Sequence, residues 1–403
     1  MNQKRTNFLL IGDNQTILES PLARQYLKKI KLIYIDPPYN TNSAKSYDDK
    51  TDSGKWLATL EKILRLLREY LAENGCIFIS IDDNEYASLK LACDKIFSKD
   101  NFLGTFITRQ SQRSNSKFIN TAHEYILCYA KNKNSLERFS VKRMDIPEQR
   151  AMIKAISGEV KKLLPMGRKA AEKRLRQLIG EYCEKYEITW LKNYNRVDDD
   201  GNIYFASDLS VPGEPREVSI KKINLRLAPL KTRGWVSDKK FIELHSQGAL
   251  AFRGGRPYQK NYLGDASDNA PSILNFYSRF GTKDLEALGL RDVFDTPKPV
   301  QLIKFLIRIA NLSDGDIVMD CYAGSGTTGQ AVMEINNEDG KAINFILIQK
   351  KEPVSPESKA FGRCGAFGIE PYISEIIKLR LKRVIEKSAQ SIDLDIIEPG
   401  QGD

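Results

Sequence analysis

The sequence contains few of the residues that build metal sites or disulfide frameworks. Its 403 residues include six cysteines and two histidines, and no two cysteines form a CxxC pair. This scatter argues against a zinc site and against a disulfide scaffold, so we expect no bound metal. The first apolar run, residues 8–11, is too short for a signal peptide. No stretch approaches the roughly 20 apolar residues that span a bilayer, so we expect a cytoplasmic protein without membrane contact.

The excess of positive charge is concentrated in the middle of the chain. The net charge is +10, and residues 151–180 carry eight Lys/Arg against two Asp/Glu. Residues 216–263 carry eleven Lys/Arg against three Asp/Glu, so the remainder of the chain is net negative. A polyanion such as DNA would be attracted to these segments. A solvated charged surface has the same composition, and charge alone leaves both interpretations open.

Two segments, residues 6–135 and 298–350, alternate short apolar runs with helical periodicity. The predicted strands are residues 8–11, 32–35, 77–81, 125–129, 317–320 and 344–348. The predicted helices are residues 56–71, 300–310 and 329–335. This alternation predicts an α/β fold with a parallel sheet and helices on both of its faces.

In residues 140–290, strand and helix patterns no longer alternate, which predicts a separate insert. Residues 161–186 predict a basic helix pair that is interrupted near Pro165 and Gly180, and residues 200–265 are rich in turns and short strand patterns. The expected organisation is therefore a first α/β part in residues 1–139 and an insert in residues 140–290. A second α/β part, residues 291–403, ends in a C-terminal helix.

A short polar turn, Asp36-Pro37-Pro38-Tyr39-Asn40, directly follows the predicted strand at residues 32–35. It therefore lies at the carboxyl edge of the sheet, where open α/β folds bind ligands. The Asp36 carboxylate and the rigidly held Pro37 carbonyl could accept the hydrogens of an exocyclic base amine and favour its attack on a sulfonium methyl. Tyr39 could stack on a base extruded from a duplex. The alternative is a structural turn that merely ends a strand.

Three glycines, Gly324, Gly326 and Gly329, have the G-x-G-x-x-G spacing between a predicted strand and a predicted helix. Alone, this pattern suggests a dinucleotide site. Asp320 ends the strand and can meet an ammonium group, which favours S-adenosylmethionine. The acid that a dinucleotide site has about 20 residues further on is replaced by Gln349, with Glu352 as a second candidate. A purely structural glycine-rich turn is the remaining alternative.

Together these motifs resemble the β-class amino-methyltransferases, and among them the modification subunits of type III restriction–modification systems. The resemblance covers most of the chain and rests on GDN at 12–14, DPPYN at 36–40, NG at 74–75, ISIDD at 79–83, HEY at 123–125, GWVS at 234–237, GRPY at 255–258, TPKP at 296–299, DCYAGSGTT at 320–328, NEDG at 337–340 and FILIQ at 345–349. The sequence departs from the family at Cys321, where Pro or Phe is common, and the chain is shorter than is usual for these subunits.

The resemblance implies a Rossmann-like S-adenosylmethionine-dependent methyltransferase fold, with residues 140–290 as the target-recognition domain and the other two parts as the catalytic domain. It implies site-specific methylation of adenine N6 in DNA and assigns catalysis to Asp36, Pro37, Pro38 and Tyr39. It assigns cofactor binding to Asp13, Thr296, Lys298, Pro299, Asp320, Tyr322, Ala323, Gly324, Ser325, Gly326, Thr327, Thr328 and Gln349. Contacts with the target base are assigned to Asn40, His123 and Tyr125. The basic residues of the insert add Arg226, Arg233, Arg253 and Arg256 as candidates for contacts with phosphates or bases.

The expected partner is double-stranded DNA. The resemblance also raises a homodimer and a helicase–nuclease restriction subunit as partners, and the residues themselves show neither. Asp36 favours adenine, because cytosine-N4 methyltransferases usually have Ser at this position and protein-glutamine or RNA methyltransferases favour Asn. Methylation of cytosine N4 is the alternative reaction. A DNA-recognition subunit without turnover, serving a partner nuclease, is the alternative of a different class.

Overall fold

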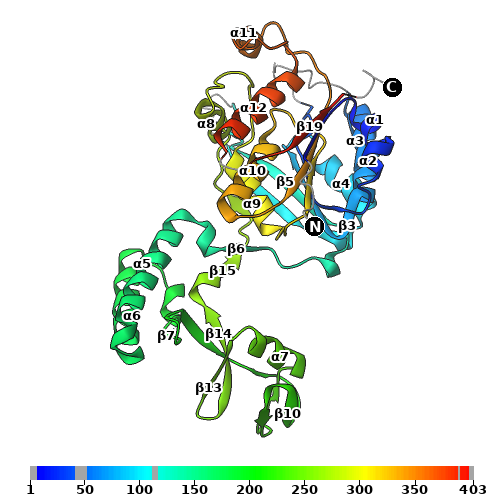
Figure 1. Ribbon diagram of the computed structural model, residues 1–403. Helices are drawn as coiled ribbons and strands as arrows, with labels where there is room; N and C mark the ends of the chain where they lie inside the picture. The colour runs from blue at the N-terminus through cyan, green and yellow to red at the C-terminus, as the bar shows by residue number, and fades with distance from the viewer. Residues whose placement is uncertain (1–6, 41–51, 111–116, 389–390, 399–403) are drawn as a thin grey trace. The chain divides into compact units, whose positions relative to one another are not determined.

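The computed structural model of the protein describes residues 7–40, 52–110, 117–388 and 391–398 (Figure 1). The chain forms two compact units, of which unit 1 combines residues 1–139 with residues 270–403 and unit 2 comprises residues 140–269. The sequence predicts the second boundary at 290, which is 21 residues later than the end of unit 2 at 269. Strand β16 (Ile273–Leu274) pairs with β4 (Phe102–Arg109), and α8 (Arg279–Ala287) packs on α9 (Val300–Ile309), so this segment belongs to unit 1.

Within the described residues, unit 1 is built on a nine-stranded sheet with the order β16-β4-β5-β3-β2-β17-β18-β1-β19. Its remaining strands are β1 (Asn7–Ile11), β2 (Ile30–Ile35), β3 (Leu71–Ile81), β5 (His123–Ala130), β17 (Ile317–Asp320), β18 (Asn344–Gln349) and β19 (Leu394–Ile397). The strands from β3 to β19 are parallel, as predicted. The prediction is wrong at β5, which runs antiparallel to β3 and β4. No helix crosses over between β4 and β5 in the described residues, and a parallel connection needs such a crossover.

Helices cover both faces of this sheet (Figure 1). One face carries α1 (Asn14–Glu19), α3 (Ser53–Tyr70) and α4 (Tyr86–Phe97), and the other carries α9, α10 (Thr327–Asp339) and α12 (Ile373–Lys387). Helix α3 buries the side chains of Trp56, Leu60, Ile63, Leu64 and Leu67, whose spacing of three or four residues forms one apolar stripe. None of the described helices is long and apolar enough to cross a membrane.

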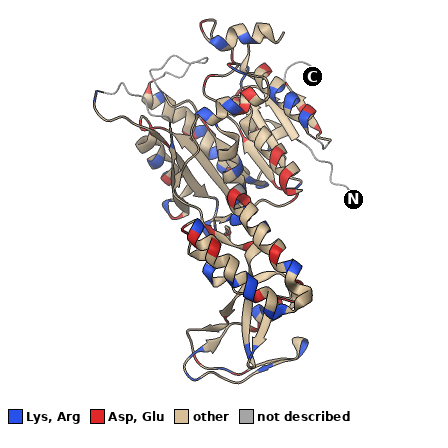
Figure 2. Ribbon diagram, turned by 90° about the vertical axis from the view of Figure 1, so that its left-hand side faces the viewer, with Lys and Arg blue, Asp and Glu red and all other residues tan. Residues whose placement is uncertain are grey.

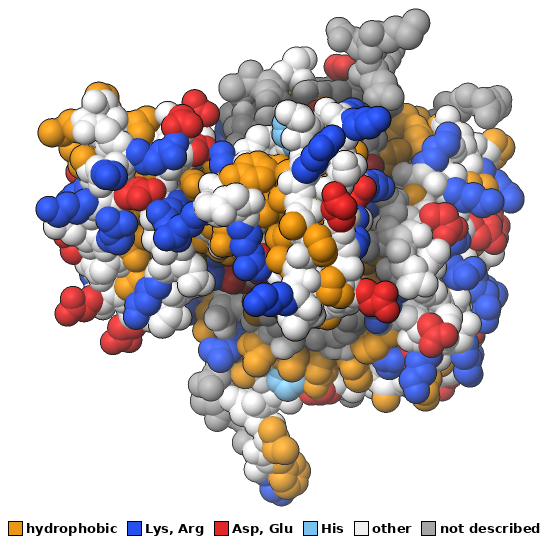
Figure 3. All heavy atoms as spheres, turned by 90° about the horizontal axis from the view of Figure 1, so that it is seen from below, with side chains coloured by type: hydrophobic (Ala, Val, Ile, Leu, Met, Phe, Trp, Pro, Cys, Tyr) orange, Lys and Arg blue, Asp and Glu red, His pale blue; other side chains and the backbone are white. Residues whose placement is uncertain are grey.

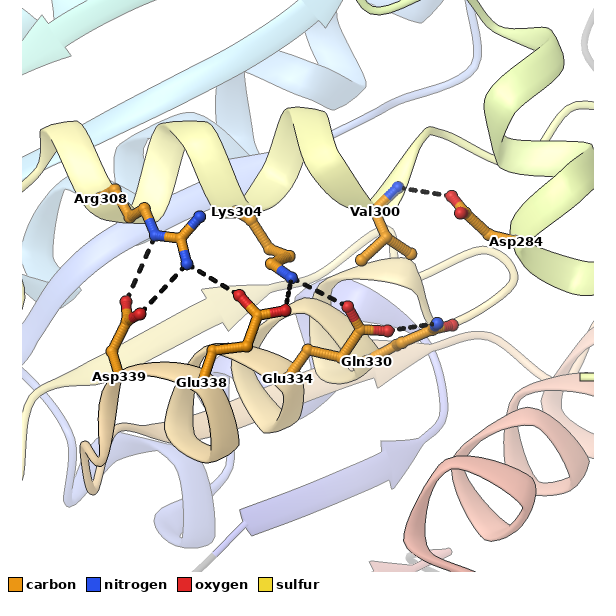
Figure 4. Close-up of polar contacts among 8 residues, drawn as sticks. All are labelled: Asp284, Val300, Lys304, Arg308, Gln330, Glu334, Glu338 and Asp339. Atoms are coloured by element: carbon orange, nitrogen blue, oxygen red, sulfur yellow. Dashed lines mark hydrogen bonds and ion pairs between the residues drawn. The ribbon is translucent and has the colours of Figure 1, made fainter. Parts of the chain in front are cut away.

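An ion-pair network fastens α9 to α10 (Figure 4). The Lys304 ammonium, on a side chain that is only 1% exposed, lies 3.0 Å from Glu334 and also contacts Glu338. Arg308, one turn further along α9, lies 2.8 Å from Glu338 and 3.2 Å from Asp339. Because a buried ammonium without a partner would cost several kcal/mol, these carboxylates determine which face of α10 meets α9.

Unit 2 contains a helix pair and a small antiparallel sheet. The helices are α5 (Pro147–Leu163) and α6 (Arg168–Lys185), and the sheet has the order β13 (Leu250–Arg253), β14 (Arg256–Tyr262), β8 (Ile203–Asp208) and β7 (Arg196–Val197). The predicted interruption near Pro165 is confirmed, but α6 continues through Gly180. A single glycine costs a helix only about 1 kcal/mol, and α6 offsets this by burying an apolar face against α5.

Most of the positive charge of the chain belongs to unit 2. Its 25 Lys/Arg and 17 Asp/Glu give a net charge of +8, out of +10 for the whole chain. Basic and acidic residues are mixed along the helices α5 and α6, whereas the strands β11 (Leu225–Leu227), β13 and β14 carry basic but no acidic residues (Figure 2). In the space-filling view the basic side chains are likewise interspersed with acidic and hydrophobic ones (Figure 3). The excess charge is therefore distributed over the surface and does not form one continuous basic band on the face shown.

Gly281→Ala tests the packing of α8 in unit 1. A Cβ atom at Gly281 would lie 1.9 Å from the carbonyl oxygen of Pro297 and 2.9 Å from the carbonyl carbon of Lys298, so the backbone must shift. We expect the free energy of unfolding to fall by about 1–3 kcal/mol in urea denaturation. The control is Gly362→Ala in α11 (Lys359–Ala366), where nothing lies within 4 Å of the added atom. It should stabilise the protein by up to about 1 kcal/mol, and equal effects of the two substitutions would contradict the packing.

Candidate active site

The DPPYN turn and the glycine-rich turn meet at one edge of the sheet. Strands β2 and β17 are parallel neighbours with Met319 opposite Ile33, so Asp36 and Asp320 both lie at the carboxyl edge. The next strand after β2 in sequence, β3, lies on one side of this pair, and the next strand after β17, β18, lies on the other side. Such a reversal of strand order is the place where open α/β sheets bind ligands.

Two adjoining clefts open at this edge. The first has an empty volume of about 670 Å³ and is lined by Tyr34, Asp36, Pro38, Phe294, Thr296, Pro297, Lys298, Asp320, Tyr322, Ala323, Gly324, Ser325, Thr327, Thr328, Gln349, Glu352 and Ile373. The second, of about 1230 Å³, is lined by Asp13, Pro37 and Trp56 among others. The clefts share Pro38, Tyr322, Gln349 and Glu352. An elongated ligand could therefore occupy both.

Lys298 draws two carboxylates and a phenol together beside the first cleft. Its ammonium lies 2.7 Å from Glu124 Oε2 and 3.3 Å from Asp36 Oδ1, and it donates to the Tyr39 hydroxyl at 2.7 Å. Tyr39 in turn donates to Asp36 Oδ1 at 2.7 Å. Burial raises the pKa of Asp36, and Lys298 opposes that rise. Burial also lowers the pKa of Lys298, but Asp36 and Glu124 outweigh it and keep the pKa well above its ordinary value.

Asp320 is the second buried carboxylate of the cleft. It is 2% exposed, and it accepts hydrogen bonds from Thr328 Oγ1 at 2.6 Å and from the backbone N–H of Tyr322 at 3.0 Å. Burial raises the pKa of Asp320 to about 7, and the two hydrogen bonds oppose that rise. A cationic group beside it would favour the ionised carboxylate, so the cleft is suited to a positively charged ligand.

The glycine-rich turn is held by Gln349. Gly324 and Gly326 have φ angles of 53° and 83°, a left-handed conformation that favours glycine. The Gly324 N–H donates to Gln349 Oε1 at 2.9 Å, and the Gln349 amide donates to the Lys350 carbonyl at 3.2 Å. Both ends of the Gln349 amide are therefore engaged within the protein. Glu352, which follows β18, also lines both clefts.

Most residues predicted to bind the cofactor do line the first cleft: Thr296, Lys298, Asp320, Tyr322, Ala323, Gly324, Ser325, Thr327, Thr328 and Gln349. Asp13 lines the second cleft and also caps α1, because its carboxylate accepts from Thr16 N at 3.0 Å. Pro299 and Gly326 are not among the lining residues of either cleft. They stand at the N-caps of α9 and α10, where they set the direction in which each helix leaves its turn.

The sequence predicts that Tyr39 stacks on the target base, whereas in the structure its ring is buried beside Lys298. It is 7% exposed, and the Lys298 ammonium lies 4.9 Å from the centroid of its ring. Its hydroxyl donates to Asp36, so in this structure Tyr39 orients the Asp36 carboxylate. The turn itself is anchored from α3, because the Trp56 indole N–H donates to the Pro38 carbonyl at 2.7 Å.

Asn40, which the sequence places beside the target base, closes the turn. Its φ of 58° is left-handed, a conformation that asparagine tolerates. Its side chain donates to Glu85 Oε1 at 2.9 Å, and the same oxygen accepts from Ser53 Oγ at 2.6 Å. Glu85 is the N-cap residue of α4, so Asn40 joins the turn to the adjoining helix.

Glu124, the middle residue of the HEY motif on β5, joins Asp36 and Tyr39 around Lys298, which the sequence does not predict. His123 and Tyr125, predicted to face the base, bond to each other at 2.8 Å, and Tyr125 donates to Asp83 at 2.8 Å. Glu124 lies between them on β5 and contacts Lys298. Successive side chains of a strand point to opposite faces, so Glu124 contacts Lys298 from one face of β5 while His123 and Tyr125 lie on the other. The only signal in the sequence was the motif itself.

The four arginines predicted to contact DNA fall into two pairs. Arg233 donates to the hydroxyl and carbonyl of Ser210 at 2.8 and 2.9 Å, and Arg256 forms an ion pair with Asp208 at 2.9 Å. Both residues are exposed and are also held by partners within unit 2. Arg226 on β11 (Leu225–Leu227) and Arg253 on β13 are exposed.

Comparison with known proteins identifies the family. Residues 30–360 match the DNA methylase family N6_N4_Mtase. The chain belongs to this DNA methylase family. It is 29% identical, over 89% of its length, to the Mod subunit of the type III restriction-modification enzyme EcoP15I of Escherichia coli, and spans 61% of that protein. It is also 29% identical, over 88% of its length, to the type II methyltransferase M.KpnI of Klebsiella pneumoniae, of which it spans 82%.

The predicted resemblance to type III modification subunits and the predicted Rossmann-like fold are confirmed. The chain spans about three fifths of the length of the Mod subunits of EcoP15I, EcoPI and StyLTI. Among solved structures, it is similar to a putative DNA modification methylase of Thermus thermophilus complexed with S-adenosyl-L-methionine. The TM-score is 0.44 at 14% identity, over 98% of this chain and 100% of the other.

Asp320→Asn should make the stability of the protein less dependent on pH. Folding raises the pKa of Asp320 to about 7, so between about pH 4 and pH 7 the folded state retains a proton that the unfolded chain has released. Stability is therefore lost as the pH rises through this window. Relative to wild type, Asp320→Asn should gain roughly 2–3 kcal/mol in unfolding free energy between pH 5 and pH 8 in urea denaturation. The exposed control Asp100→Asn should gain nothing, and parallel behaviour of both variants would contradict the raised pKa.

Proposed function

We propose that the chain is a DNA methyltransferase that transfers the methyl group of S-adenosylmethionine to the exocyclic N6 amine of adenine. The observation that carries this proposal is the meeting of Asp36-Pro37 with the Asp320 turn at the carboxyl edge of β2 and β17. Membership of a DNA methylase family supports it. The relatives named as Mod subunits and as M.KpnI support a place in a restriction–modification system.

The residues around the two clefts suit S-adenosylmethionine. When bound, this cofactor supplies a methyl group that is activated on a sulfonium. Asp320, which is buried and accepts its hydrogen bonds from uncharged donors, would hold the ammonium group of the cofactor's amino-acid end and become ionised in doing so. Glu352 would accept the ribose hydroxyls, because the amide of Gln349 is already engaged with the glycine-rich turn. Asp13 in the second cleft would lie toward the adenine end.

Asp36 and Pro37 would raise the nucleophilicity of the target amine. The lone pair of an exocyclic amine is delocalised into the base, and acceptors that bind its two hydrogens would localise that pair on nitrogen. The Asp36 carboxylate is one acceptor, and the backbone carbonyl of Pro37 is the other. Tyr39 and Lys298 hold Asp36 at 2.7 and 3.3 Å, so the carboxylate is oriented before the base arrives.

The choice of adenine rests on the residue type at position 36. Among the β-class amino-methyltransferases that the sequence resembles, a carboxylate at this position is typical of the adenine-N6 enzymes, whereas the cytosine-N4 enzymes usually have Ser. Methylation of cytosine N4 would use the same geometry and is the alternative reaction.

Unit 2 would supply the recognition of the DNA sequence. Its net charge of +8 favours a polyanion, and the exposed Arg226 and Arg253 are its candidates for contacts with phosphates or bases. Double-stranded DNA is the proposed substrate. A homodimer and a restriction subunit are proposed from the similarity to the Mod subunits alone.

Transfer of labelled methyl groups from S-adenosylmethionine to unmethylated genomic DNA, followed by nucleoside analysis, tests the reaction. We expect N6-methyladenine from the wild-type protein. Asp36→Ala should lower kcat by about 10²–10³-fold because a preorganised polar partner of the reacting group is lost, while S-adenosylmethionine still binds in calorimetry. Asp100→Asn, at an exposed position, should retain full activity.

The products distinguish the alternatives. N4-methylcytosine would overturn the choice of adenine but keep the mechanism. DNA binding without any transfer by the wild-type protein would favour a recognition subunit without turnover. Undiminished transfer by Asp36→Ala would refute the role of the carboxylate.

The double substitution Arg226→Ala/Arg253→Ala tests DNA binding by unit 2. Loss of two phosphate contacts should weaken binding to DNA of any sequence and reduce the slope of log affinity against log salt concentration by about 1–2. The measurement is fluorescence anisotropy with a labelled duplex at several salt concentrations. Arg65→Ala on α3, whose side chain is 61% exposed, is the control and should leave the slope unchanged. An unchanged slope in the double variant would show that unit 2 contacts DNA through other residues.

A further inference from the structure

Arg380 of α12 is a buried cation beneath the glycine-rich turn. It is 0% exposed, and its Nη1 donates to Ser325 Oγ at 2.7 Å, to Thr327 Oγ1 at 2.8 Å and to the Ser325 carbonyl at 3.3 Å. Its Nε donates to Gln330 Oε1 at 2.8 Å. Burial lowers the pKa of Arg380 to about 10, so the guanidinium remains charged at neutral pH.

The position of this guanidinium is fixed by the packing of α12 on the turn. A Cβ atom at Gly326 would lie 3.1 Å from Ile377 Cγ2, and one at Gly329 would lie 2.8 Å from Leu381 Cδ2. The two glycines thus let α12 approach closely, and Ile377 and Leu381 flank Arg380 along the helix. The guanidinium cannot withdraw from the turn unless α12 moves.

A polar chain behind Arg380 fixes its orientation. The Gln330 amide donates to Glu334 Oε1 at 2.8 Å, and Glu334 accepts from Lys304 at 3.0 Å on its other oxygen (Figure 4). Because Glu334 accepts the amide N–H, the carbonyl oxygen of Gln330 is left to face Arg380. Arg380 therefore joins the turn to the ion-pair network between α9 and α10.

The guanidinium has more donors than the protein satisfies. Its Nη2 has no hydrogen-bond partner among the described residues, and Arg380 forms no ion pair with a carboxylate within the described ranges. An incompletely compensated buried cation is costly. It also creates a positive potential behind the turn, whose residues Ser325 and Thr327 line the first cleft together with Asp36 and Asp320.

A guanidinium can only donate, so the hydroxyl oxygens of Ser325 and Thr327 must accept from it. Their own hydrogens are thereby directed away from Arg380. Thr327 Oγ1 donates its hydrogen to the Lys298 carbonyl at 3.3 Å, so the donor that the turn offers a ligand is the Ser325 hydroxyl. Both residues line the first cleft. The turn consequently presents the Ser325 hydroxyl as a donor in front of a buried positive charge, an arrangement that suits an anion.

We propose that Arg380 is a positioning residue that orients the Ser325 hydroxyl to bind the carboxylate of S-adenosylmethionine, while Asp320 receives the ammonium group of the same ligand. The inference rests on the proposed function and adds to it the residue that recognises the anionic end of the cofactor. A purely structural role, in which Arg380 only fastens α12 to α10, is the competing explanation. It predicts equal damage to the binding of every ligand of the cleft.

The test compares two ligands that differ by one carboxylate: S-adenosylmethionine and its decarboxylated analogue. Their dissociation constants are measured by calorimetry on the full chain, without DNA. Arg380→Gln should weaken the binding of S-adenosylmethionine by about tenfold or more, and that of the decarboxylated analogue by less than about threefold. Arg380→Lys, which retains a charge, should recover part of the difference.

Two further variants keep the test independent of folding. Ser325→Ala removes one donor and leaves Arg380 in place, so it should show the same carboxylate-selective loss at a smaller size. Arg308→Gln alters the ion-pair network between α9 and α10 away from the turn (Figure 4). It should bind both ligands as the wild-type protein does. Thermal unfolding of each variant reports whether its fold is retained.

The outcomes separate this inference from the proposed function. If Arg380→Gln and Ser325→Ala weaken both ligands equally, Arg380 is structural and the inference is wrong. If the wild-type protein binds neither ligand, the proposed cofactor is wrong. A selective loss of affinity for the ligand that carries the carboxylate supports both.

Discussion

The parallel pairing of β2 with β17 is the interaction on which the site depends. All six residues of β2 are buried, and three of the four in β17, so burial of apolar side chains drives these two strands together although they are distant in sequence. Because a shift of one residue would turn each side chain to the opposite face, the register also determines where Asp36 and Asp320 lie. The geometry of the site is thus a consequence of how the core packs.

That geometry concentrates negative charge. Asp36, Glu124 and Asp320 share the region with one ammonium, that of Lys298. Lys298 is engaged with Asp36 and Glu124, which leaves Asp320 compensated only by hydrogen bonds. The raised pKa of Asp320 reflects the free energy needed to ionise a buried carboxylate that has no cationic partner among the described residues. A ligand with positive charge at the Asp320 side would relieve it, so the electrostatics of the protein alone already select the kind of ligand that the cleft accepts.

The sequence predicts the strands and the motifs well because both are local patterns. The direction of β5 depends on how the chain returns after β4, and hydrophobic periodicity carries no such information. The boundary at 290 was misplaced because residues 270–290 are rich in turns, like the insert, although they pack on unit 1. Glu124 and Arg380 were missed for a common reason: a charged residue in a strand or an amphipathic helix is normally solvated, and only the tertiary structure shows that these two contact the site.

The glycine-rich turn shows why its motif alone could not identify a ligand. Gly324 and Gly326 adopt left-handed conformations, while Gly326 and Gly329 make room for Ile377 and Leu381 of α12. Backbone geometry and helix packing thus account for all three glycines without any ligand. The same spacing would arise wherever a strand, a tight turn and a closely packed helix follow one another. What distinguishes one ligand from another must lie in the side chains around the turn, and here these are the carboxylate of Asp320 before it and the hydroxyls within it.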